Sequence, residues 1–260
     1  MADGESTQLY EVIEPQAPLR RAPSPDASLD TEALRGERVA VTEITDEGWA
    51  HGRLESDGYV GFLPASALAR PGPAPTHRVT ALRALAFPGP SIRLPPVGAL
   101  PLGARIAVAR SEGPFAVTAS GSYLPARHLA PIGVDETDFV AVAERFLNAP
   151  YLWGGKTSLG LDCSGLVQIS LAACGIACPR DTVGQEPAFA RSSSPSGKLQ
   201  RGDLIFWEGH VAIVRDEATL IHANAFHMSV AIEPIAEAVE RIRAADGEVT
   251  SVRRPANATQ

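Results

Sequence analysis

The sequence lacks the features that would place it among disulfide-rich, membrane-spanning or nucleic-acid-binding proteins. Only three cysteines occur in 260 residues, an odd number that suits a reducing compartment better than a disulfide framework. No apolar run is long enough to span a bilayer. The net charge is −7 without a basic stripe, so we expect neither nucleic acid nor an anionic membrane surface among its partners.

The amino-terminal residues also lack a secretion signal. The first eight residues, MADGESTQ, are acidic and polar, whereas a signal peptide has a basic segment followed by an apolar core. We therefore expect a cytoplasmic protein. A chain of 260 residues has room for two or three domains, each with a core of its own.

The most informative stretch is residues 151–167, YLWGGKTSLGLDCSGLV, in which glycines lead to a single cysteine. An apolar run follows and predicts a buried helix that Gly175 would end. Its buried face would comprise Leu166, Val167, Ile169, Leu171 and Ala173. Cys163 would begin this helix, where free N–H groups and the helix dipole favour a thiolate. The sequence therefore predicts a nucleophile at Cys163.

Two histidines farther along the chain provide a base for this nucleophile. Apolar runs on either side of residues 215–217 indicate two strands joined by a tight turn. A hairpin centred on Asp216 makes His210 and His222 cross-strand neighbours on one face, because they are equally distant from it. One imidazole can then take the Cys163 proton while the other orients it, as covalent catalysis requires.

The first half of the sequence predicts two small all-β domains. Residues 10–69 contain strand-like runs with glycine turns, typical of a small barrel, at 37–44, 48–54 and 58–64. A proline-rich linker at 70–75 separates them from residues 76–132. The second segment ends with GSYLP where the first has GYVGFLP, so we expect two copies of one fold.

A third domain is expected from residue 133 to residue 255 and opens with a helix. Apolar residues from Phe139 onward fall at helical spacing. Asp135 or Thr137 would cap this helix, with Asp138 in its first turn. Helices here and strands around the histidines predict an α+β protein.

These motifs resemble the NlpC/P60 cell-wall cysteine peptidases, a papain-like group. The resemblance rests on LDCSGLV, GHVAI and IHAN, at residues 161–167, 209–213 and 221–224, and it covers the chain from about Asp135 onward. The upstream half is similar to two bacterial SH3 domains. The three-part layout is similar to the γ-D-glutamyl-L-diamino acid endopeptidases that act on released peptidoglycan peptides. It implies a papain-like domain behind two SH3-like barrels.

The resemblance also implies residues that bind the substrate. In the SH3-bearing endopeptidases, acidic and hydroxyl groups hold the free N-terminal amine of the peptide, and the matching residues here are Tyr151, Asp162, Ser164 and Asp181. A carboxylate suits an ammonium group, and a blocked amine would leave it unpaired. Structural alternatives stay open: Asp181 can cap a helix, and Ser164 can merely start one. Tyr151 can pack, or it can support the oxyanion.

The same resemblance implies that the first SH3 domain closes one end of the cleft. Asp30 and Tyr59 are the candidates to lie beside the amine. Glu32 is a rival for Asp30, and a solvated loop carboxylate is the plainer interpretation. His227 follows the strand of His222, and it either lines the pocket or simply packs.

The predicted reaction is hydrolysis of the γ-D-glutamyl bond to diaminopimelate or lysine. Cys163 attacks the carbonyl, its backbone N–H helps to hold the oxyanion, His210 moves the proton, and His222 holds the His210 ring. A cytoplasmic enzyme of this kind would recycle imported wall fragments. The sequence leaves the oligomeric state open.

No cofactor or metal is expected for this reaction, so activity should be insensitive to EDTA. Cys174 and Cys178 have no nearby histidine or further cysteine to complete a zinc set, and we interpret them as small buried side chains. Two other functions stay open: a wall-binding scaffold with an idle peptidase domain, and a papain-like amidase or acyltransferase that acts on another bond.

Overall fold

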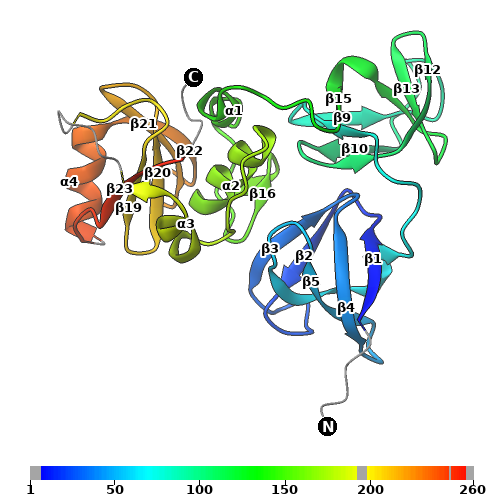
Figure 1. The fold of residues 1–260 in the computed structure, drawn as a ribbon, viewed down its shortest axis with the longest axis horizontal. Helices are drawn as coiled ribbons and strands as arrows, with labels where there is room; N and C mark the ends of the chain where they lie inside the picture. The colour runs from blue at the N-terminus through cyan, green and yellow to red at the C-terminus, as the bar shows by residue number, and fades with distance from the viewer. Residues whose placement is uncertain (1–6, 192–197, 246, 256–260) are drawn as a thin grey trace. The chain divides into compact units, whose positions relative to one another are not determined.

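The structure, a computed structural model, describes residues 7–191, 198–245 and 247–255. The chain divides into two compact units, residues 1–134 and residues 135–260 (Figure 1). None of the helices in these described ranges combines the length and the apolar character that crossing a bilayer requires.

The first unit contains a seven-stranded antiparallel sheet in the order β3-β2-β6-β5-β4-β1-β7. The sheet curls around a core that includes Val12, Leu19 and Leu63. The strands predicted at 37–44, 48–54 and 58–64 correspond to β4, β5 and β6. The bounds are β1 Gln8–Val12, β2 Gln16–Arg20, β3 Leu29–Leu34, β4 Arg38–Ile44, β5 Trp49–Leu54, β6 Val60–Pro64 and β7 Leu68–Ala69.

The rest of the first unit forms three small sheets, β11-β8-β15, β9-β10 and β12-β13-β14. They enclose a separate core that includes Val79, Leu100 and Leu124. Their strands are β8 His77–Val79, β9 Arg83–Ala86, β10 Gly98–Pro101, β11 Arg105–Ile106, β12 Val108–Glu112, β13 Phe115–Thr118, β14 Tyr123–Pro125 and β15 Leu129–Pro131.

The sequence repeat in the first unit has a matching backbone. Pro64 and Pro125 have nearly the same φ and ψ, −58° and 125° against −56° and 120°. Each proline leads into a single 3-10 turn, η1 Ala65–Ala67 or η2 Ala126–His128, and then into a short strand. The two segments therefore end in the same strand–turn–strand unit.

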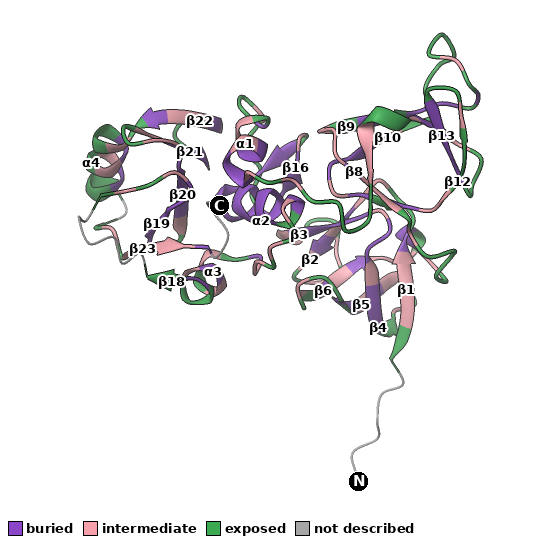
Figure 2. Ribbon diagram, turned by 45° about the horizontal axis from the view of Figure 1, so that its top comes forward, coloured by how far each residue is buried: buried purple, intermediate pink, exposed green. Residues whose placement is uncertain are grey.

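The second unit is a six-stranded antiparallel sheet in the order β18-β23-β19-β20-β21-β22. Helix α4 lies on one side of this sheet, and α1 and α2 lie on the other (Figures 1 and 2). The bounds are α1 Phe139–Glu144, β16 Lys156–Thr157, β17 Gly160–Leu161, α2 Cys163–Ala173, α3 Thr182–Ala188, β18 Ala190–Arg191, β19 Leu204–Trp207, β20 His210–Val214, β21 Thr219–Asn224, β22 Ser229–Pro234, α4 Ile235–Ala245 and β23 Ser251–Arg254.

Helix α1 begins at Phe139, and its cap differs from the predicted one. The side chain of Asp138, rather than that of Asp135 or Thr137, accepts hydrogen bonds from the backbone N–H groups of Val140 and Ala141. Asp138 also accepts from Arg201, a residue far along the chain. This distant partner explains the shift of the cap, because local sequence alone allows all three residues to serve.

Helix α2 confirms the prediction around Cys163. The apolar residues named for its face are 5% exposed or less, and the helix is buried along almost its whole length (Figure 2). Gly175 lies just past its end with a φ of 72°, the left-handed conformation that commonly ends helices. A helix buried all round serves as the central element of the unit.

Candidate active site

Cys163 is the first residue of α2, as predicted. Its sulfur lies against the peptide groups on either side of His210: Sγ is 4.0 Å from the carbonyl oxygen of Gly209, and the backbone N–H of Val211 points toward it. Among the described residues, the thiol hydrogen bond goes to Gly209 O and not to an imidazole nitrogen. The resting thiol is thus next to the candidate base but not yet bonded to it, as is common before substrate binds.

The two histidines meet as predicted, but through a different register. His210 Nε2 lies 2.9 Å from His222 Nδ1, and the ring centroids are 5.1 Å apart. The ladder pairs Ile213 with Ile221 and Val214 with Leu220, so the hairpin is centred on Glu217 instead of Asp216. His210 and His222 are therefore diagonal neighbours and not directly opposite each other. They still lie on the same face of the sheet, because the pairing is shifted by two residues, which is one side-chain period of a strand.

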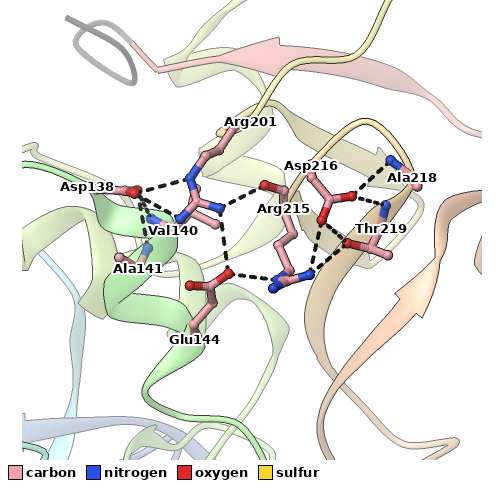
Figure 3. Close-up of polar contacts among 9 residues, drawn as sticks. All are labelled: Asp138, Val140, Ala141, Glu144, Arg201, Arg215, Asp216, Ala218 and Thr219. Carbon is pink, nitrogen blue, oxygen red and sulfur yellow. Dashed lines mark hydrogen bonds and ion pairs between the residues drawn. The ribbon is translucent and has the colours of Figure 1, made fainter.

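The turn of this hairpin is held by side chains, which explains the shifted centre. Asp216 Oδ1 accepts from the N–H groups of Ala218 and Thr219, at 2.9 and 2.8 Å, and closes a three-residue loop. Arg215 bonds Glu144 of α1 at 2.7 Å in a network that also contains Arg201 and Asp138 (Figure 3). The network ties the turn of the histidine hairpin to helix α1.

A carboxylate that the sequence analysis did not single out extends the histidine pair. Glu233 of β22 has Oε1 2.7 Å from His222 Nε2, and Arg241 of α4 donates to the same oxygen at 2.6 Å. A continuous chain of hydrogen bonds therefore runs from His210 to α4. The pairing of β21 with β22 sets Glu233 against Leu220, a long-range register that no local motif announces.

Asp162 is the N-cap of α2 and is paired with a buried arginine. Arg180 is 2% exposed, and it donates to both carboxylate oxygens of Asp162, at 2.9 and 2.8 Å. The same carboxylate accepts from the N–H groups of Gly154 and Gly165 and from the Ser164 hydroxyl. Five protein donors thus occupy Asp162, and a substrate ammonium would have to share it. Arg180 was not among the residues predicted from the sequence.

The glycine of the DCSG motif is explained by the same cluster. A Cβ on Gly165 would lie 2.3 Å from the carbonyl oxygen of Gly155 and 3.0 Å from Asp162 Oδ1. No side chain fits there, because backbone and a buried ion pair cannot move aside cheaply. The start of α2, the glycine approach and Arg180 therefore pack as one block beneath the nucleophile.

The prediction of a thiolate at Cys163 was wrong, because the surroundings of the sulfur favour the neutral thiol. Burial, and then the Asp162 carboxylate, raise the pKa of the thiol to about 12. The N–H groups of Val211 and Ser164 and the charge of Arg180 lower this pKa, but their effect is smaller. Desolvation disfavours the charged form more than the helix start favours it. Burial, followed by His222 and Arg241, lowers the pKa of His210 to about 3 despite Glu233. Thiol and imidazole are therefore both neutral at rest.

We expect the free energy of unfolding to fall as the pH drops from 7.5 to 5. Burial lowers the pKa values of His210 and His222 below the ordinary 6.5, so the unfolded chain binds more protons below that pH than the folded chain. The limiting slope is about 1.4 kcal/mol per pH unit for each proton. Urea unfolding at several pH values measures it. His210→Gln should reduce the slope and His77→Gln should not; equal slopes in all three proteins would contradict the expectation.

Tyr151 precedes the glycine approach to α2 in the sequence, and Asp181 directly follows Arg180. Tyr151 is half-buried, and burial, then the nearby Cys163 and Asp162, raise the pKa of its phenol to about 12. The hydroxyl is therefore a permanent donor near the sulfur. Asp181 stands at the N-cap position of α3 without making a side-chain cap hydrogen bond, and its charge acts on the buried Arg180. Substrate binding by both residues stays a prediction.

The remaining predicted residues are His227, which follows β21, and two residues of the first unit. His227 Nδ1 is 3.0 Å from Asn224 Oδ1 and 3.4 Å from Glu233 Oε1, so it borders the histidine chain. Asp30 pairs with Arg21 at 3.1 Å, and Tyr59 packs against the first core. Their expected place beside the substrate amine stays a prediction.

The other two cysteines differ from their expected burial. Neither Cys174 nor Cys178 is part of a disulfide, and both are only partly buried, because they lie at the end of α2 and in the segment that follows it. Cys178 Sγ is 3.4 Å from the carbonyl oxygen of Pro179. Within the described ranges, no group of three or more His, Cys, Asp or Glu side chains is arranged to hold a metal ion.

Family profiles match both units of the chain. Residues 148–244 match the NlpC/P60 family, and residues 19–68 match the bacterial dipeptidyl-peptidase SH3 domain. The first match contains Cys163, His210, His222 and Glu233. The second covers most of the curled seven-stranded sheet.

Similar proteins share nearly the whole layout. A γ-D-glutamyl-L-lysine dipeptidyl-peptidase of Bacillus subtilis is 28% identical over 255 residues, which cover 88% of this chain and 82% of the relative. One of Bacillus cereus is 27% identical over 241 residues, covering 80% and 71%. The crystal structure of an NlpC/P60 family protein from Bacillus cereus superposes with a TM-score of 0.79 at 21% identity, covering 95% and 99%. The chain is thus a cysteine peptidase that combines an NlpC/P60 domain with a bacterial SH3 domain in its amino-terminal unit.

Proposed function

We propose that this peptidase hydrolyses the γ-D-glutamyl bond to a diamino acid in peptidoglycan-derived peptides that have a free N-terminal L-Ala. The observation that carries the proposal is the position of the Cys163 sulfur against the peptide groups flanking His210. The bond specificity is supported by the two relatives named γ-D-glutamyl-L-lysine dipeptidyl-peptidases. Both align with this chain across the two units.

The proposed reaction begins from a neutral thiol and a neutral imidazole. His210 accepts the thiol proton as Cys163 Sγ attacks the γ-carbonyl carbon, so the charge develops only when substrate is present. The backbone N–H of Cys163 and the Tyr151 hydroxyl are the proposed donors to the oxyanion. The tetrahedral intermediate collapses to a thioester, and His210 returns the proton to the leaving amine. Water activated by His210 then releases L-Ala-γ-D-Glu.

The proposed amine site centres on Asp181, with Asp162 and Ser164 behind it. Asp162 and the Ser164 hydroxyl are already bound to Arg180, so their contribution is to shape the floor of the site. Asp181 is exposed, which suits a carboxylate that meets an ammonium from solvent.

A requirement for a free amine would restrict the enzyme to released peptides. In intact peptidoglycan the nitrogen of L-Ala is part of an amide bond, and an amide carries no charge for a carboxylate to bind. The enzyme would then act in peptide recycling, which agrees with the cytoplasmic location expected from the sequence.

The cleaved bond is tested by mass analysis of peptide digests. Wild-type enzyme should convert L-Ala-γ-D-Glu-meso-diaminopimelate or its L-Lys counterpart to L-Ala-γ-D-Glu and the free diamino acid. The α-linked isomer is the matched control and should remain intact. Cleavage of the α-linked peptide at an equal rate, or of neither peptide, would contradict the proposed specificity.

Acetylation of the substrate amine should lower kcat/KM by roughly 10- to 100-fold, because an amide nitrogen carries no charge to pair with Asp181, and a hydrogen bond between charged groups contributes about 1.5–3 kcal/mol. The acetylated and free tripeptides would be compared as competing substrates in one digest. Asp181→Asn should lower kcat/KM for the free tripeptide and leave the slow acetylated one unchanged. If the blocked peptide is cut equally well, the amine site is wrong even where the γ-bond specificity holds.

A further inference from the structure

Beyond the two histidines lies a carboxylate that accepts two short hydrogen bonds. Glu233 Oε1 is 2.7 Å from His222 Nε2 and 2.6 Å from an Arg241 nitrogen, and His227 Nδ1 approaches it at 3.4 Å. The histidine and the carboxylate are 1% and 9% exposed. A bonded chain of this kind, shielded from water, imposes a direction on every proton in it.

The proton positions follow from the chemistry of each group. An ionised carboxylate only accepts hydrogen bonds, so His222 must carry its proton on Nε2. His222 Nδ1 is then a bare acceptor, and its 2.9 Å partner, His210 Nε2, must be the nitrogen that donates. A neutral His210 with its proton on Nε2 has a free lone pair on Nδ1. Nδ1 is therefore the nitrogen left to receive the proton of Cys163.

Arg241 keeps the carboxylate in the state that this direction requires. Burial raises the pKa of Glu233, but His222 and Arg241 outweigh it and lower the pKa to about 2. A protonated Glu233 could donate to His222 Nε2 and reverse the chain. Arg241 itself is held by the Phe226 ring, whose centroid lies 4.4 Å from its guanidinium carbon.

We infer that Glu233 is a positioning residue for the proposed reaction: acting through His222, it sets the His210 tautomer whose Nδ1 accepts the thiol proton. Glu233 touches neither the sulfur nor the substrate carbonyl in this role, and it keeps its charge throughout the reaction. The inference rests on the proposed roles of Cys163 and His210. It adds Glu233 and Arg241 to the residues on which the base depends.

The first test needs no substitution of Glu233. Nitrogen-15 NMR of the full chain at pH 7 distinguishes the protonated from the bare ring nitrogen of each histidine, with His210→Gln and His222→Gln used for assignment. We expect the proton on Nε2 in both residues. A proton on Nδ1 of either His210 or His222 would overturn the inference. This measurement uses no peptide, so it stands even if the proposed substrate proves wrong.

The second test removes the acceptor and then restores it without charge. Glu233→Met should mix the His210 tautomers and lower kcat by roughly 10- to 100-fold with little change in KM, because a hydrogen bond to a charged group is lost. Glu233→Gln should retain the tautomer and lose less than about tenfold, because Arg241 can only donate and so keeps the amide oxygen in place.

The exposed Glu237 of α4 provides the matched control, and Glu237→Gln should leave both the tautomers and kcat unchanged. Wild-type tautomers together with full kcat in Glu233→Met would refute the role of Glu233. If Glu233→Met does not fold, the wild-type spectrum and Glu233→Gln decide the matter. If Cys163→Ala proves fully active, the proposed function fails separately, while the tautomers are still read directly.

Discussion

Cys163→Ala should lower kcat/KM for the γ-linked tripeptide by roughly 10⁴-fold or more, to the detection limit of the digest. Without the sulfur no thioester can form, and the neighbouring donors can only assist direct attack by water. The buried position of Cys163 at the start of α2 means that the smaller alanine fits without a clash. The loss should therefore appear in activity and not in the thermal stability of the second unit.

The two other thiols of the chain serve as matched controls for this substitution. Cys174→Ala and Cys178→Ala should retain near wild-type activity, because both residues lie at the far end of α2 or beyond it. Alkylation of Cys163 independently checks whether its thiol is neutral at rest. A thiol whose pKa is about 12 should react slowly with iodoacetamide at pH 7 in the absence of substrate. Substantial turnover by Cys163→Ala would remove the basis for the proposed mechanism.

Arg180→Met should destabilise the second unit by about 3–5 kcal/mol, because it leaves the Asp162 carboxylate buried without its charge partner. Arg180 is 2% and Asp162 is 7% exposed, so water cannot replace the guanidinium. The substitution also removes the hydrogen bond from Arg180 to the Gly155 carbonyl. Urea unfolding of the full chain, followed by tryptophan fluorescence, measures the loss.

The double variant Asp162→Asn/Arg180→Met isolates the charge. Asparagine can still cap α2 and has no charge to bury, so the double variant should be more stable than Arg180→Met alone. Arg145→Met is the matched control, since it breaks the half-exposed pair of Arg145 with Glu136. Such pairs contribute about 1 kcal/mol or less. Equal losses in Arg180→Met and Arg145→Met would show that burial of the Asp162 pair is unimportant.

The neutral resting state changes how the helix start is understood. The position of Cys163 at the start of α2 was predicted correctly, but the expected thiolate was not found, because burial and Asp162 outweigh the helix end. Sequence reasoning recognises a helix terminus from local residues. The degree of burial depends on everything packed around it, and that includes Arg180 and the glycine approach.

The histidine pair shows the same division between local and distant causes. Alternation along two strands sufficed to predict that His210 and His222 share a face, because a shift of one side-chain period preserves it. The centre of the turn was wrong, since Asp216 closes the loop with its own side chain. A carboxylate in a turn can accept hydrogen bonds in several loops of similar length. Which of these loops forms depends on how the strands on both sides pair.

By itself the sequence determined the buried helix behind Cys163, the strands β4, β5 and β6 of the first sheet, and the meeting of two imidazoles. Each of these follows from residues close together in the chain, through periodicity, glycine placement or strand alternation. Only the tertiary structure decided the partners of these groups: Arg180 for Asp162, Glu233 and Arg241 for His222, and Asp138 as the cap that meets Arg201. Those contacts join separate elements, and their strength comes from exclusion of water, which a linear pattern does not encode.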